Sequence, residues 1–117
     1  MDIHDLVAAL IARDALRARQ WVADAERAGF NWGGVAEPHD LDSTALALAA
    51  ALVEMMSSRY GIQAPAWTSV VPAAPRRVFL VRAAEMLPRL RRLCEEEGPE
   101  PLRRRGLLAP PDFLTAA

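Results

Sequence analysis

Residues 41–61 read LDSTALALAAALVEMMSSRYG, the longest uninterrupted helix pattern in the chain. Asp42 is placed to cap the first turn, and apolar residues then recur at intervals of three and four. Leu41 and Leu46 have the spacing of a hydrophobic staple. The stretch predicts a central, buried helix that ends at its closing glycine, with an alanine face that lets another helix approach closely.

The residues before this stretch predict two more helices. Asp2 is placed to cap the first and Asp14 the second, while Gly29 is a stop signal. One continuous bent helix is the alternative. A loop over 29–42 follows. The second helix is expected to run to about Ala28, with Trp21 at its margin and with buried Ala15, Ala18, Val22 and Ala25.

The residues after it have a different composition, because residues 61–117 hold eight of the nine prolines. Prolines at 65, 72 and 75 exclude a long helix over 62–76. Residues 77–81 fit either a short strand or the entry to a helix. Pro88 fits the first turn of a helix that ends at Gly98, and a short helix is expected over 101–105.

These patterns predict an all-α fold, a compact helical domain with a Pro-rich, segmented C-terminal half. We expect residues 1–117 to form a single domain, since neither 1–60 nor 61–117 is rich enough in apolar residues to fold alone. The formal net charge is −1, which argues against a general nucleic-acid binder. The first half has five arginines and nine acids, and the second has nine arginines and six acids.

The location expected from the sequence is the cytoplasm, without a membrane span. The N-terminus is acidic rather than basic, unlike a secretory signal. The longest apolar run, residues 45–53, is about half of the ~20 residues that a membrane span needs. One cysteine, Cys94, excludes an internal disulfide framework and Cys-based zinc sites.

The residue types that catalysis requires do not occur in a recognisable pattern. There is no phosphate-binding glycine loop, and the two histidines, His4 and His39, lie far apart in the sequence. The acidic residues around His39 fit capping and turn roles better than a cation site. Three glutamates follow Cys94, and their charge disfavours a reactive thiolate. We therefore predict a non-enzyme with no metal and no cofactor.

Aromatic and arginine residues are the features that remain for binding. The aromatic residues are expected either in the core or on an exposed binding surface, and the sequence leaves both open. They are Trp21, Phe30, Trp32, Trp67 and Phe79. Arg91 and Arg92 stand four residues before Glu95 and Glu96, so pairs within one helix are expected there, with charges answering to a partner as the alternative.

The run Arg103-Arg104-Arg105 stands at the end of the short helix expected over 101–105. Cations at that position complement the helix dipole. Three consecutive arginines point around most of a helix, so at least one is expected against the body of the protein. A protein partner and nucleic-acid phosphates are the alternatives, the latter together with Arg76 and Arg77.

A spaced motif in the C-terminal half gives the chain a resemblance to a known family. It consists of Gly61-x-x-x-Pro65-x-Trp67, then Phe79-Leu80, then Glu97-Gly98-Pro99-Glu100-Pro101-Leu102-Arg103-Arg104-Arg105-Gly106, and finally Asp112-Phe113-Leu114. This pattern, with a matching stretch over 13–25, resembles a bacterial family similar to the antitoxin-side proteins encoded beside nucleotidyltransferase-type toxins. The match covers about half of the chain. The longer relatives carry a helix-turn-helix, whose short turn the 29–42 connection does not match.

The resemblance implies a protein-interaction module, antitoxin-like, whose partner is a nucleotidyltransferase-type toxin. The residues that match the family pattern, and that we therefore expect at the partner interface or in its support, are Trp67, Phe79, Arg103, Arg104 and Arg105. The alternatives are a nucleic-acid-binding protein that uses the C-terminal arginines, and a homo-oligomer whose alanine-rich helix packs against its own copy.

Overall fold

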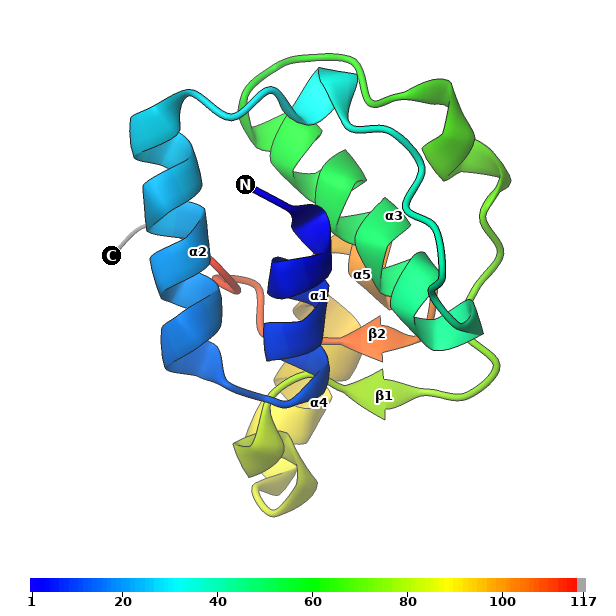
Figure 1. The fold of residues 1–117 in the computed structure, drawn as a ribbon. Coiled ribbons are helices and arrows are strands. Elements are labelled where there is room, and N and C mark those ends of the chain that lie inside the picture. The colour runs from blue at the N-terminus through cyan, green and yellow to red at the C-terminus, as the bar shows by residue number, and fades with distance from the viewer. Residues whose placement is uncertain (116–117) are drawn as a thin grey trace.

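The computed structural model describes residues 1–115 as a mostly helical, all-α domain with one small sheet among them (Figure 1). The α-helices are α1 (Ile3–Ile11), α2 (Ala15–Ala28), α3 (Ser43–Arg59), α4 (Pro88–Glu97) and α5 (Glu100–Arg103). The shorter elements are the 3-10 turns η1 (Trp32–Gly34), η2 (Ala66–Val70) and η3 (Arg82–Glu85) and the strands β1 (Val78–Phe79) and β2 (Leu107–Leu108).

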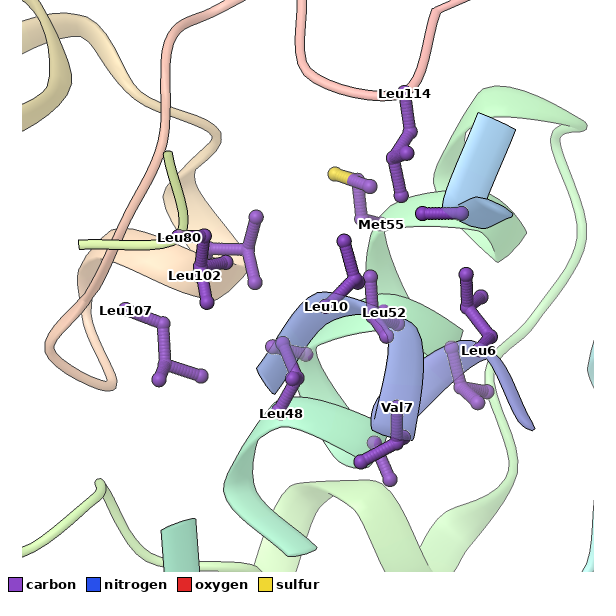
Figure 2. Close-up of a cluster of buried hydrophobic side chains, with 14 of the residues drawn as sticks. Leu6, Val7, Leu10, Leu48, Leu52, Met55, Leu80, Leu102, Leu107 and Leu114 are labelled. Atoms are coloured by element: carbon purple, nitrogen blue, oxygen red, sulfur yellow. The ribbon is translucent and has the colours of Figure 1, made fainter. Parts of the chain in front are cut away.

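Helix α3 is the centre of the fold, as predicted. Eleven of its 17 residues are buried, and α1, η1, η2 and α5 all contact it. Figure 2 shows leucines of α1 and α3 meeting in the core, with Leu80, Leu102 and Leu107 beside them. The main hydrophobic cluster therefore takes residues from both halves of the chain.

The alanines of α3 serve this internal packing. All five are buried within residues 1–115 and at most 5% exposed, because neighbouring elements of the same chain cover them. The alanine face is therefore covered by described residues of the same chain and offers no surface for the packing against a second copy that the sequence left open.

Two separate helices precede α3, and the alternative of one bent helix is wrong. Arg13 has a left-handed φ of 57°, which interrupts the helical conformation between α1 and α2. The Asp14 carboxylate then accepts a hydrogen bond from the Arg17 amide, and Gly29 ends α2 at φ 68°. Ala18, Val22 and Ala25 are buried as predicted. Ala15, predicted to be buried, is exposed: it is the first residue of α2, and residues 14–17 around it are exposed as well.

Of the two alternatives for residues 77–81, the structure shows the short strand, with β1 at Val78–Phe79. β1 pairs in parallel with β2, Val78 opposite Leu107 and Phe79 opposite Leu108. The Val78 amide donates to the Gly106 carbonyl at 2.8 Å, and the Leu80 amide donates to that of Leu108 at 2.8 Å. This short sheet brings two arginine-bearing segments, 73–77 and 103–106, side by side.

None of the helices within residues 1–115 is long and apolar enough to cross a membrane.

Candidate functional site

The aromatic residues do not form one binding surface. Trp21, Phe30 and Trp32 pack together, with ring centroids 4.7–5.9 Å apart, and Trp32 is buried. Trp67 is half-buried against the main cluster, where its indole N–H donates to the Val35 carbonyl at 2.8 Å. These contacts fix the loop over 29–42 and η2 onto the helices.

Phe79 lies apart from these aromatics, in a small second cluster with Ala84, Cys94 and Leu108. Two guanidinium groups approach its ring, that of Arg77 at 5.9 Å from the centroid and that of Arg91 at 5.5 Å. Arg91 also donates to the carbonyls of Ala84 and Glu85. Phe79 thus organises arginines around the start of α4.

Arg105 is a buried structural arginine. Its residue is 4% exposed, and its guanidinium donates to both carboxylate oxygens of Glu54 and to the Thr68 carbonyl at 2.8 Å. Burial opposes ionisation of Glu54, but the hydrogen bond and charge of Arg105, aided by Arg104, outweigh it and lower the pKa of that carboxyl. The pair joins α3 to the segment after α5.

The other two arginines of the run are more open. Arg104 is exposed and forms ion pairs with Glu54 and, at 3.9 Å, with Glu100. Arg103 is half-buried, and its guanidinium donates to the Glu96 carbonyl at the end of α4. The expectation that at least one arginine of the run lies against the body is therefore confirmed by Arg105, and Arg104 shares its partner Glu54.

An arginine-lined cleft lies where the two segments meet. It encloses about 450 Å³ between residues 73–77 and 103–106, with Glu95 and Leu108 also on its wall. We call it the arginine cleft. It brings together Arg76, Arg77, Arg103, Arg104 and an edge of Arg105.

The charge pairs in and near this cleft differ from those expected within α4. Neither Arg91–Glu95 nor Arg92–Glu96 is an ion pair in the described chain, so that expectation is wrong. Glu95 pairs instead with Arg77 across the wall of the cleft. Glu95 pairs with this residue from outside its own helix because the parallel sheet places Arg77 beside α4.

No group of three or more His, Cys, Asp or Glu side chains within residues 1–115 is placed to hold a metal ion. His4 lies between the Asp2 carboxylate and the His39 carbonyl, 2.7 and 2.9 Å from its two ring nitrogens. Cys94 is buried, and burial, followed by the charge of Glu95, raises the pKa of its thiol.

Sequence reasoning missed two charged residues of α3 that the structure makes important. Glu54 binds the arginine run, and Arg59 donates to the carbonyls of Phe113 and Leu114, the latter at 2.8 Å. The available signal was the position of Glu54, a lone carboxylate inside an otherwise apolar helix. A charge at such a position requires a partner.

No protein-family model, curated protein or solved structure matches this chain. The arginine cleft is therefore interpreted from its own geometry and chemistry.

Proposed function

We propose that this protein is a non-catalytic interaction module that binds an acidic segment of a protein partner in the arginine cleft. The observation that carries the proposal is the convergence of Arg76, Arg77, Arg103 and Arg104, from two separate segments, on one hollow. Guanidinium groups match carboxylates in shape and charge, and two or more of them can hold successive acids.

The internal contacts support a preformed cleft. Arg105 and Glu54 fix the segment after α5, and the parallel sheet fixes the segment before β1. Arg76 makes no ion pair with any described residue, which leaves its charge for a ligand. Binding at such a site costs little reorganisation of the backbone.

The resemblance to the antitoxin-side family supports a specific partner, a nucleotidyltransferase-type toxin in the cytoplasm. Carboxylates beside the metal-binding cleft of such a partner would be the acidic segment that the arginine cleft holds. In this proposal Arg103 and Arg104 contact the partner, while Trp67, Phe79 and Arg105 support the surface. Among the described residues, no Ser, Thr, Cys or Lys lines the cleft, and its one carboxylate, Glu95, is paired with Arg77, which favours binding over catalysis.

A charge-reversed variant tests the proposal. The purified chain should bind a fluorescein-labelled oligoglutamate peptide, and Arg76→Glu/Arg103→Glu should weaken that binding at least about tenfold. Arg89→Glu/Arg92→Glu is the matched control, because it makes the same charge change at exposed positions of α4 outside the cleft. Equal binding by both variants would contradict the proposal.

A pull-down from the native cytoplasm with the same three proteins identifies the partner. After nuclease treatment, a stoichiometric protein captured by the wild type and the control but lost with the cleft variant is expected. A nucleic acid that binds in its place, with an affinity that falls steeply with salt, would replace the protein partner in this proposal.

A further inference from the structure

A second hollow, of about 610 Å³, lies in the other half of the chain, between the end of α2 and the residues that follow α3. Figure 1 shows the C-terminal ends of these two helices at the same end of the molecule. Phe30, Tyr60 and Ile62 line it together with the edge of Trp32. We call it the aromatic groove.

The walls of the aromatic groove combine exposure with fixed geometry. The Tyr60 and Ile62 side chains are exposed, 48% and 41%, although they are large and apolar. The Phe30 ring packs edge-on against Trp32, with centroids 4.7 Å apart, so it cannot swing away freely. Ordered, exposed aromatic surface of this kind favours binding, because little side-chain entropy remains to be lost.

Glu26 gives the groove its charge. It is the one charged residue among the described residues that line the hollow. One of its carboxylate oxygens accepts a hydrogen bond from the Tyr60 hydroxyl at 2.7 Å, which fixes carboxylate and ring relative to each other. The groove therefore presents π faces and a single negative charge. Arg59 attracts Glu26 electrostatically, but its guanidinium is held by the Phe113 and Leu114 carbonyls and is not on the lining.

We propose that the aromatic groove binds an arginine side chain from a basic segment of a protein partner. Its guanidinium pairs with the second carboxylate oxygen of Glu26 and lies over the rings of Phe30 and Tyr60, while its aliphatic stem packs on Ile62. A planar guanidinium suits both contacts at once, since it forms ion pairs with carboxylates and stacks on aromatic faces. The chain itself holds two guanidinium groups over Phe79 in this way.

This site is separate from the arginine cleft in both position and charge, and the inference does not rest on the function proposed above. The two hollows share no lining residue. One selects acids and the other a base, so the molecule is able to engage two segments of opposite charge.

Titration with N-acetyl-arginine amide, followed by NMR on the full chain, tests the proposal. At millimolar concentrations we expect shifts of the amide signals of Gly29, Asn31 and Ile62. N-acetyl-citrulline amide, which has the same shape without the charge, should bind about tenfold more weakly, as expected for losing one ion pair and one cation–π contact.

Two variants assign the effect to the groove. Glu26→Gln should weaken binding of the arginine probe, though less than replacing arginine by citrulline does, because the cation–π contact remains. The matched control Glu37→Gln, an exposed carboxylate outside the groove, should bind like the wild type. Both positions are exposed, so the folds are expected to persist, and circular dichroism checks this. Equal affinity for the two probes, no shift at those amides, or an unchanged affinity in Glu26→Gln would overturn the proposal.

Discussion

Helices α3 and α4 are attached to the same body by different forces. In α3 the buried residues face neighbours on every side, and its one interior charge is paired with Arg105. In α4, Cys94 alone among the described residues is buried, and the contacts are made mainly by guanidinium groups: Arg91 to two carbonyls, Arg77 to Glu95 and Arg103 to the Glu96 carbonyl. The fold therefore has an apolar interior that fixes its shape and a periphery held by guanidinium contacts.

The largest expected effect comes from breaking the charge pair of the interior. Glu54→Ala leaves the Arg105 guanidinium buried without its carboxylate and should lower the free energy of unfolding by about 3–5 kcal/mol. Urea denaturation measures this. The peripheral counterpart, Glu95→Ala, removes an exposed pair and should cost about 0–1 kcal/mol. Similar losses in both variants would show that the interior pair is no more important than the peripheral one.

A pair of leucines extends the comparison to apolar contacts. Leu52 of α3 is fully buried, so Leu52→Ala should lower the free energy of unfolding by about 2–5 kcal/mol through lost contacts and a cavity. Leu90 of α4 is half-buried, and Leu90→Ala should cost about 1 kcal/mol. A smaller loss for Leu52→Ala than for Leu90→Ala, measured by the same denaturation, would contradict the division into interior and periphery.

The smallest effect concerns His4, which connects α1 to the 29–42 loop. The hydrogen bond to the His39 carbonyl, followed by that to Asp2, raises the pKa of its imidazole above the ordinary 6.5. The protonated ring donates from both nitrogens, so the stabilisation is complete below the unfolded pKa and is lost as the pH rises through the higher folded value.

This loss is measurable as a difference in melting temperature between the wild type and His4→Asn. The wild type should be the more stable at about pH 5, and its advantage should shrink as the pH rises past about 6.5 towards 8. An advantage that stays constant or grows with pH would contradict the assignment of the proton to this contact.

Contacts within a few residues could be predicted from the sequence. Asp2, Asp14 and Asp42 each accept the amide hydrogen bond expected of an N-cap, because capping depends only on the next turn of the chain. Gly29 adopts its left-handed conformation for the same local reason. The starts of α1, α2 and α3 therefore followed from sequence pattern alone, whereas the short helix expected over 101–105 is Glu100–Arg103 in the structure.

Contacts between distant segments could not be predicted in this way. Glu95 was expected to pair with Arg91 on its own helix, but it pairs with Arg77, 18 residues away. Glu54 binds Arg105 across 51 residues. The Arg77–Glu95 pair depends on the parallel pairing of β1 with β2, two strands of two residues each, whose sequence signal is weak. The Glu54–Arg105 pair depends on the packing of α5 against α3. The arginine run was found from the sequence, whereas the cleft it lines required the fold.

The burial of Cys94 makes local opening of the periphery measurable as a rate of thiol alkylation. It is the only thiol in the chain, and α4 with the small cluster around Phe79 covers it. Because an alkylating reagent reaches the sulfur only while α4 is detached, the labelling rate counts those openings directly. Occupation of the arginine cleft, whose wall includes Glu95 of the same helix, would slow that rate, so a single thiol reports on partner binding without an added label.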